Sequence, residues 1–408
     1  MLQANTKKAF ISEKAERACR NGHPWVYSEQ VLECEGEYEN GDLIDVYSKK
    51  RKFIGTGFIN DNSKIRIRLI SRNANDTFDD NFYRRRIRYA IDYRLTVMGD
   101  DFECCRIIFG EADSFPGLTV DKFGDILVVQ ILSLGFERIK NRLLPLFIEV
   151  FEEYGIHIRA IMERSDAQIR LKEGLTPYKG FFPHEKLTTL DDGRIIINEN
   201  GISYNVDIID GQKTGFFLDQ KYNRLAVAKI AKGKTVLDCF THTGAFALNA
   251  AKAGAKHVTA VDISQDAVTL TKANAVMNGL ADVMDFVCAD VFDLLTEMEQ
   301  TKKCSYDLII LDPPAFTKSR DTVRSAFNGY KAINAKAMKL LPRGGYLATC
   351  SCSHFMTDEL FRKMLHEAAD DASVQLRQIE ARQQSPDHPI LWNVPETDYL
   401  KFYIFQVV

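Results

Sequence analysis

The stretch that decides the fold of the second half of the chain covers residues 235–262 and reads TVLDCFTHTGAFALNAAKAGAKHVTAVD. Two short apolar runs, 235–238 and 258–262, flank an alanine-rich segment that has helical character from Ala245 onward. A strand, a helix and a second strand in this order form a right-handed unit with parallel strands. Each predicted strand ends in an acid, Asp238 and Asp262.

The same alternation continues toward the C-terminus. A helix is predicted from Asp266, a strand over 307–312, a helix through 325–340 and a strand over 346–350. This pattern predicts the α/β class, with a doubly wound, Rossmann-like parallel sheet over residues 189–408. In such sheets, ligands bind outside the carboxyl ends of the strands.

The strand ends indicate a nucleoside cofactor without phosphate. The turn after Asp238 contains one glycine, Gly244, in place of the G-x-G-x-x-G pattern that cradles a pyrophosphate. Asp262 follows 24 residues later, where a carboxylate can accept hydrogen bonds from both ribose hydroxyls, and Asp290 ends a third run, where it could accept from an adenine amine. Each acid alone could equally be a helix N-cap, but three successive strand ends favour S-adenosylmethionine. Phe240, Gly244 and Ser264 complete this predicted pocket.

Two further strand ends carry the candidate chemistry. The fourth ends in Asp312-Pro313-Pro314-Ala315-Phe316, a carboxylate followed by a stiff turn and an aromatic ring that could stack on an extracted base. The fifth runs into Cys350, within the strand, and Cys352, just beyond it. We assign Cys350 to the buried core and Cys352 to a nucleophilic role.

A thiol has a physical purpose at that place. Carbon 5 of cytosine or uracil is too weakly nucleophilic to attack a methyl sulfonium, so a thiolate first adds to carbon 6 and makes carbon 5 enamine-like. Asp312 would hydrogen-bond the ring nitrogen or the exocyclic amine and stabilise this adduct. Asp312 and Cys352 are therefore the predicted catalytic residues.

The front half is predicted to hold two smaller domains, a β-rich one over residues 1–75 and an α+β one over 76–188. Lys64, Arg66 and Arg68 alternate with apolar residues, which predicts three cations on one strand face and a phosphate-contacting patch. A solvated strand face is the alternative. The basic helix predicted near 82–89 could likewise contact RNA or form salt bridges.

Composition narrows the class of protein. The formal charge of -3 argues against a surface that binds polyanions everywhere, so RNA binding must come from local patches. The nine cysteines lack zinc-site spacing, so no metal is predicted. No membrane span or signal peptide is apparent, and a cytoplasmic protein is expected.

With these residues in view, the whole chain resembles the bacterial 23S rRNA cytosine-5 methyltransferases of the large-subunit methyltransferase I type. The resemblance rests on short motifs spread from end to end: GHPWVY at 22–27, GFIN at 57–60, GEAD at 110–113, PGL at 116–118, ERSD at 163–166, GQKTGFFLDQ at 211–220, SCS at 351–353, DHP at 387–389 and YLK at 399–401.

The resemblance implies a PUA domain, a middle β-β-α-β-β domain and a class I methyltransferase domain that uses S-adenosylmethionine. It implies Cys352 as the nucleophile and makes the 213–224 segment part of the cofactor pocket, with Lys213, Thr214 and Gly215. Gln220 and Arg224 could hold the methionine carboxylate of the cofactor. The implied partner is 23S rRNA or a large-subunit assembly intermediate, and a homodimer is possible.

Two departures limit this transfer. Cys350 adds a second thiol two residues before Cys352, and the Asp-Pro-Pro-Ala-Phe motif has no cysteine to release the product. Two rival functions stay open: methylation of an exocyclic or ring nitrogen, as in guanine, which needs no thiol, and a non-catalytic RNA-binding assembly factor.

Overall fold

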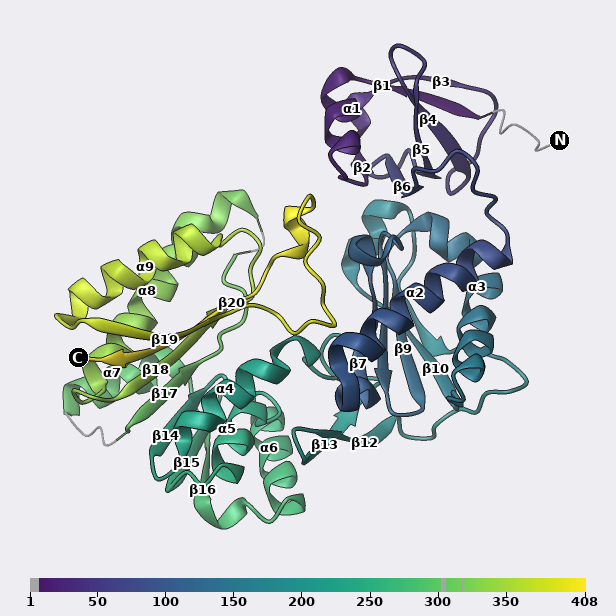
Figure 1. Cartoon of the computed structure of the whole chain (residues 1–408). Coiled ribbons are helices and arrows are strands. Elements are labelled where there is room, and N and C mark those ends of the chain that lie inside the picture. The colour runs from purple at the N-terminus through teal and green to yellow at the C-terminus, as the bar shows by residue number, and fades with distance from the viewer. Residues whose placement is uncertain (1–6, 302–305, 318) are drawn as a thin grey trace. The chain divides into compact units, whose positions relative to one another are not determined.

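The computed structural model describes residues 7–301, 306–317 and 319–408 (Figure 1). The chain divides into two compact units. The first holds residues 1–195, 206–218 and 386–397, and the second holds 196–205, 219–385 and 398–408. The first residues of the chain, 1–6, on which the expectation about a signal peptide rested, lie outside the described residues.

The first unit begins with a six-stranded sheet. Its strands lie in the order β2-β6-β5-β4-β1-β3, with only β1 and β4 parallel among the recorded pairs. The apolar sides of these strands and of one helix enclose a small core that includes Ile44, Val46 and Ile67. The bounds are β1 Lys8–Ile11, α1 Glu13–Arg20, β2 Trp25–Val26, β3 Val31–Glu35, β4 Leu43–Ser48, β5 Phe53–Ile59 and β6 Ile67–Ser71.

A second sheet of the same unit has the order β11-β10-β9-β8-β7. Helices α2 and α3 lie side by side against it (Figure 1), and two ion pairs join them, Arg84 to Glu149 and Arg88 to Glu153. The bounds are α2 Asp80–Met98, β7 Cys104–Phe109, β8 Leu118–Phe123, β9 Ile126–Ile131, α3 Leu134–Glu153, β10 Ala160–Ser165 and β11 Tyr178–Phe181. A two-stranded sheet follows, formed by β12 Arg194–Glu199 and β13 Ile202–Asp207.

The second unit confirms the predicted doubly wound sheet. Its order is β16-β15-β14-β17-β18-β20-β19, in which the first five strands are parallel and β20 is antiparallel to both neighbours. The strand bounds are β14 Thr235–Cys239, β15 His257–Asp262, β16 Met284–Cys288, β17 Leu308–Leu311, β18 Tyr346–Ser351, β19 Leu376–Arg382 and β20 Lys401–Val407. The hairpin of β19 and β20 was not predicted.

Helices cover both faces of this sheet (Figure 1). On one face α7, α8 and α9 bury a large apolar core that includes Leu237, Ile309 and Tyr330, and α4, α5 and α6 cover the other. The bounds are α4 Lys221–Ala231, α5 Ala245–Lys252, α6 Gln265–Met277, α7 Val291–Thr301, α8 Val323–Leu340 and α9 Asp358–Ala372. This arrangement leaves the carboxyl ends of the parallel strands free to form a site.

One helical glycine of the first unit has no room for a side chain. A Cβ on Gly135, in α3, would lie 2.1 Å from Cγ of the buried Phe58 ring. We expect Gly135→Ala to lower the free energy of unfolding by about 1–3 kcal/mol, even though alanine favours helices over glycine. The measurement is the thermal midpoint. Gly329→Ala in α8, whose nearest neighbour would be 3.3 Å away, is the control; equal midpoints for both variants would contradict the prediction.

Candidate active site

The turn after β14 carries backbone strain. Phe240 and His242 adopt positive φ angles of 65° and 52°, a region that residues other than glycine rarely occupy. Gly244 follows at φ 81°, and a Cβ there would lie 2.6 Å from Cγ2 of Thr271. Such clustered conformations are typical of ligand sites, where the surrounding structure holds them in place.

Asp238, the last acid of β14, is fully buried next to this turn. One of its oxygens, Oδ2, accepts hydrogen bonds from the Thr241 hydroxyl at 2.6 Å and from the Ala247 amide at 3.0 Å. The other, Oδ1, has no hydrogen-bond partner among the described residues. Burial raises the pKa of Asp238 to about 7, and the charges of Asp312 and Asp262 act in the same direction.

Asp262 and Ser264 organise the end of β15. The Asp262 carboxylate accepts from the amides of His242 and Ser264, each at 2.9 Å, and so joins the turns after β14 and β15. A carboxylate has about four lone-pair positions, so it can accept further bonds from ribose hydroxyls. The Ser264 side chain caps α6 by accepting from the Ala267 amide at 3.3 Å.

Asp290 lies after β16 and accepts from the amides of Phe292 at 2.7 Å and Asp293 at 3.3 Å. This is the geometry of an acid at the start of a helix, here α7. Asp290 therefore acts as a helix N-cap, the alternative that the sequence left open for each of these acids. Of the three, Asp238 and Asp262 accept hydrogen bonds from the strained turn.

Asp312 lies directly after β17 and receives two hydrogen bonds at one oxygen. The Cys350 thiol donates to Oδ1 at 2.9 Å, and the Gln220 amide donates to the same oxygen at 3.3 Å. Burial raises the pKa of Cys350 well above its ordinary value, and the charge of Asp312 raises it further. Cys350 is buried as expected, but it is also a hydrogen-bond donor to the predicted catalytic carboxylate, which the sequence did not indicate.

Cys352 is partly exposed, and both of its neighbours are buried and anchored. The Ser351 hydroxyl donates to the Tyr330 hydroxyl at 3.1 Å, and the Ser353 hydroxyl donates to the Thr317 carbonyl at 2.9 Å. These bonds fix the backbone on each side of Cys352, so the thiol is presented from a rigid turn.

Lys401, at the start of β20, supports the same turn. Its ammonium donates to the carbonyls of Ser353 at 2.6 Å and Tyr399 at 2.9 Å. Burial lowers the pKa of Lys401 to about 8, against the opposing effects of Asp398, Cys352, Asp358 and Cys350. The sequence analysis named Lys401 only as part of the motif at 399–401 and predicted no role for it.

The Asp-Pro-Pro turn is only partly open to a substrate. Pro313 is buried and Pro314 is exposed. The Phe316 ring is partly buried against Tyr330, with the ring centroids 4.5 Å apart. Base stacking on Phe316 stays a prediction, since part of that ring already contacts the core.

Gln220 and Arg224, predicted to hold the methionine carboxylate, are both buried. Gln220 accepts from the Asn223 amide at 2.6 Å and donates toward Asp312 and Cys350. The Arg224 guanidinium pairs with Glu199 of β12 at 2.5 Å. Sequence reasoning missed Glu199, because nothing local in its strand distinguishes it from a surface acid.

Lys213, Thr214 and Gly215 belong to the first unit. There the Thr214 hydroxyl donates to Asp121 at 2.5 Å, and Arg106 pairs with the same carboxylate. Lys213 has a positive φ of 52°, and its ammonium lies 4.2 Å from the centroid of the Phe217 ring. Their role toward the cofactor stays a prediction.

The predicted strand face with three cations is wrong. Strand β6 begins at Ile67, so Lys64 and Arg66 precede it. Arg66 pairs with Asp61 at 2.7 Å, and the largely buried Arg68 pairs with Glu173 at 2.8 Å. Ser63, just before these residues, also donates to Glu173, which holds the segment as a turn.

The comparisons with known proteins agree with this architecture. Residues 10–72 match a PUA-like domain model, and residues 181–405 match the model of S-adenosylmethionine-dependent methyltransferases. Two solved structures resemble the chain in fold. A SAM-dependent methyltransferase from Streptococcus mutans has a TM-score of 0.81 at 24% identity, covering 98% of this chain and 100% of that one. A methyltransferase complexed with SAH has a TM-score of 0.83 at 24% identity, with the same coverage.

The fold and the strand-end acids therefore define an S-adenosylmethionine-dependent methyltransferase that carries a PUA-like domain. Full-length relatives narrow this class. The proteins named ribosomal RNA large subunit methyltransferase I are 38% identical in Pseudoalteromonas translucida, over 98% of this chain and 100% of the relative, and 36% identical in Aliivibrio fischeri, over 99% and 100%. The chain belongs to the ribosomal RNA large subunit methyltransferase I family.

S-adenosylmethionine is the cofactor of this class, and the residues at the strand ends fit it. The unpartnered Oδ1 of Asp238 and the remaining acceptor positions of Asp262 suit a ligand that donates hydrogen bonds. Among residues 7–301, 306–317 and 319–408 there is no group of His, Cys, Asp and Glu side chains that could hold a metal ion. Within the same ranges, no helix has the length and apolar character needed to cross a bilayer.

The raised pKa of Asp238 has a measurable consequence. The folded protein holds this proton more tightly than the unfolded chain, so the stabilisation is complete below about pH 4 and is lost as the pH rises toward 7. Asp238→Asn keeps an acceptor for Thr241 and Ala247 but does not titrate. We expect its thermal midpoint without cofactor to exceed that of the parent at pH 8 and to approach it at pH 5. If the thermal midpoints of the parent and of Asp238→Asn differ by the same amount at pH 5 and at pH 8, the raised pKa of Asp238 is contradicted.

Proposed function

We propose that this protein methylates carbon 5 of a cytosine in 23S rRNA through a covalent adduct with Cys352. The observation that carries the proposal is the partly exposed Cys352, held between two anchored serines at the carboxyl end of β18. Asp312 directly follows the neighbouring strand β17 and accepts a hydrogen bond from Cys350, two residues before Cys352. The relatives named for ribosomal RNA support the substrate.

Bound S-adenosylmethionine supplies an electrophilic methyl group. Asp238, Asp262 and the strained turn at Phe240 and Gly244 would hold it, with Gln220 and Arg224 at the methionine end. Ser264 and Asp290 complete the proposed contacts, and the contacts predicted from the sequence for Lys213, Thr214 and Gly215 stay predictions.

The protein's own groups act on the pyrimidine. The Cys352 thiolate adds to carbon 6, and the electron pair of the 5,6 double bond becomes available at carbon 5. Asp312 hydrogen-bonds the base and stabilises the charge that develops on it. Once carbon 5 is methylated, a base takes its proton, the double bond forms again and the carbon–sulfur bond breaks, which frees Cys352.

The finer assignments belong to the same proposal. We infer three domains, 1–75, 76–188 and 189–408, and a substrate that is either 23S rRNA or a large-subunit assembly intermediate. Pro313, Pro314 and Phe316 would line the path of the base, and Lys64 remains the exposed cation of the predicted basic segment. Cytoplasmic localisation and a homodimer stay predictions.

Cys352→Ala separates the proposal from its rivals. We expect methyl transfer to rRNA to fall by more than about a thousandfold, because the variant lacks the nucleophile. Cys350→Ser, which keeps a donor for Asp312, should stay within about tenfold of the parent. Mass spectrometry of digested rRNA measures 5-methylcytosine. Unimpaired turnover by Cys352→Ala would favour methylation of a nitrogen, and a parent protein that binds rRNA without any turnover would favour an assembly factor.

Asp262→Asn tests the cofactor site separately. The variant keeps the shape of the side chain but loses its charge and one acceptor oxygen, so we expect S-adenosylmethionine to bind at least about tenfold more weakly in calorimetric titration. Asp285→Asn is the control, since Asp285 lies on β16 and pairs with His257 on the surface. Equal affinity of both variants would remove Asp262 from the site.

A further inference from the structure

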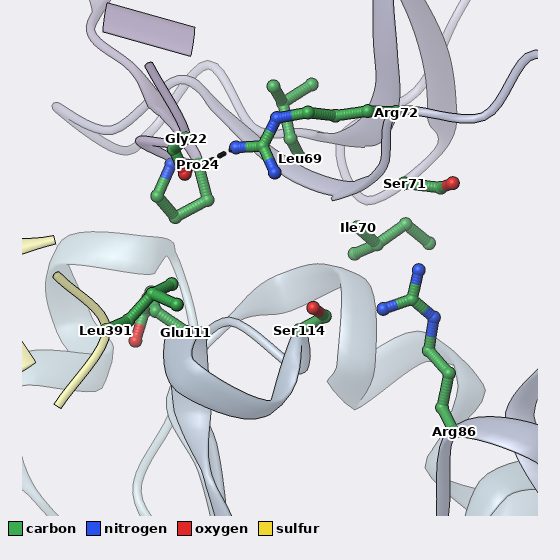
Figure 2. A pocket seen from close by; sticks show the side chains of 10 residues that line it. All are labelled: Gly22, Pro24, Leu69, Ile70, Ser71, Arg72, Arg86, Glu111, Ser114 and Leu391. Carbon is green, nitrogen blue, oxygen red and sulfur yellow. Dashed lines mark hydrogen bonds between the residues drawn. The ribbon is translucent and has the colours of Figure 1, made fainter. Parts of the chain in front are cut away.

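A small pocket lies within the first unit, where the six-stranded sheet meets α2 (Figure 2). The residues that line it include Gly22 and Pro24 of the GHPWVY motif, Arg72, Arg86, Glu111 and Leu391. Its volume is about 70 Å³, far below the roughly 300–1,000 Å³ of pockets for drug-sized ligands. A pocket of this size accepts one small group and excludes a whole nucleoside.

Arg86 is unusual among the arginines of α2. Arg84, Arg85 and Arg88 each pair with a carboxylate, namely Glu149, Asp76 and Glu153. Within the described part of the chain, Arg86 has neither an ion pair nor a hydrogen bond, and its guanidinium lies 4.6 Å from the centroid of the Phe82 ring. Burial lowers the pKa of Arg86, partly offset by the charge of Asp76, yet a guanidinium remains charged in water.

Arg72 enters the pocket from the end of the six-stranded sheet. Its Nε donates to the Cys19 carbonyl at 3.2 Å and its Nη2 donates to the Gly22 carbonyl at 2.5 Å, the bond drawn in Figure 2. A guanidinium has five N–H groups, so two bonds leave three for a ligand. The two carbonyl bonds hold the group in a fixed orientation next to α1.

The carboxylate of the pocket is already engaged. Glu111 accepts from the Trp25 indole at 2.9 Å, and its Oε1 lies 3.7 Å from Nη1 of Arg68. Arg68 is shared between Glu111, at 3.7 Å, and Glu173, at 2.8 Å. Asp76 partly offsets the charge of Arg86, but within the described residues neither Arg72 nor Arg86 forms an ion pair with a carboxylate. A small cavity with two such cations selects an anion, and the bidentate geometry of guanidinium groups suits phosphate oxygens.

An exposed aromatic residue directly follows Leu391, one of the residues that line this pocket. Trp392 is 93% exposed, although tryptophan is highly buried on average in folded proteins. Its neighbour Leu391 lines the pocket, and a Cβ on Gly22 would lie 2.9 Å from the Asn393 side-chain amide. Trp392 therefore lies in the chain between Leu391, which lines the pocket, and Asn393, whose side chain lies next to Gly22.

We propose that Arg72 and Arg86 bind one phosphodiester group of an RNA strand in this pocket and that Trp392 stacks on an adjacent base. The inference rests on the proposed function for the identity of the RNA. Proteins bind single-stranded RNA by combining cations along the backbone with aromatic rings that stack on bases. The site is independent of Cys352 and of the strand-end acids.

Arg86→Met tests the phosphate contact. Methionine keeps the apolar packing over Phe82 and removes the charge. The probe is a fluorescein-labelled 12-nucleotide oligouridine, whose affinity for the full-length protein is measured by anisotropy at several salt concentrations. We expect weaker binding and a slope of log affinity against log salt that is smaller by about 0.7, the value for one contact with a single strand. Arg84→Met, which removes an arginine paired with Glu149, is the matched control and should keep the parent slope.

Trp392→Ala tests the stacking contact, and a side chain this exposed can be removed without disturbing the fold. We expect affinity for the oligouridine to fall by about 5- to 150-fold with an unchanged salt slope. An unchanged slope for Arg86→Met together with unchanged affinity for Trp392→Ala would overturn the proposal. Binding of inorganic phosphate that Arg86→Met abolishes, without any effect of either variant on oligouridine affinity, would show a small-anion site and would also overturn the proposal.

The two proposals fail in different ways. Affinity for S-adenosylmethionine should be the same in the parent, Arg86→Met and Trp392→Ala proteins. If the parent binds oligouridine through Arg86 but makes no 5-methylcytosine, the proposed reaction fails and the RNA site stands. If the parent makes 5-methylcytosine and Arg86→Met leaves the slope of log oligouridine affinity against log salt unchanged, the proposed RNA site fails and the proposed reaction stands.

Discussion

Parallel pairing of five strands is the constraint on which the candidate active site depends. Strands β14 to β18 pair in one direction, with Leu237 opposite Thr259 and Ile309, so their carboxyl ends reach the same edge of the sheet. The side chains that follow those ends come from positions more than 100 residues apart in the chain, from Asp238 to Cys352. No dedicated loop is needed to bring these side chains together, because the backbone hydrogen bonds of the sheet set the spacing of the strand ends.

The same edge is where the protein departs from relaxed geometry. The turn after β14 holds two residues other than glycine at positive φ, and Asp238 is buried with one oxygen unpartnered. Both features destabilise the folded chain by themselves. The core under α7, α8 and α9, which includes Tyr330 and Phe361, supplies the apolar burial that offsets them. A ligand that donates hydrogen bonds to Asp238 would relieve part of this cost.

The sequence predicted the second unit better than the first. Asp238, Asp262 and Asp312 could be assigned to strand ends because strands and helices alternate regularly there, and the structure has those strands within a residue or two. The contact between Cys350 and Asp312 could not be predicted, since it depends on the register of β17 against β18. The prediction that Lys64, Arg66 and Arg68 share one strand face was wrong for a related reason. Glu173, the partner of Arg68, is 105 residues away, and no local pattern reveals it. The antiparallel pair of β19 and β20 was missed. Polar residues hide the strand periodicity of β19, whereas β20 is an apolar run that the sequence analysis did not assign.

The path of the chain joins the two units at several places along the sequence. The first unit is completed by 206–218 and 386–397, so the backbone passes from one unit to the other five times. Buried Arg94 of α2 donates to the Asp387 carbonyl at 2.9 Å, and the Asp387 carboxylate accepts from the Arg106 amide at 2.8 Å. A polypeptide that ended near residue 188 would leave those donors without their acceptors. Synthesis must therefore reach almost the last residues before the first unit has all of its residues and those hydrogen bonds.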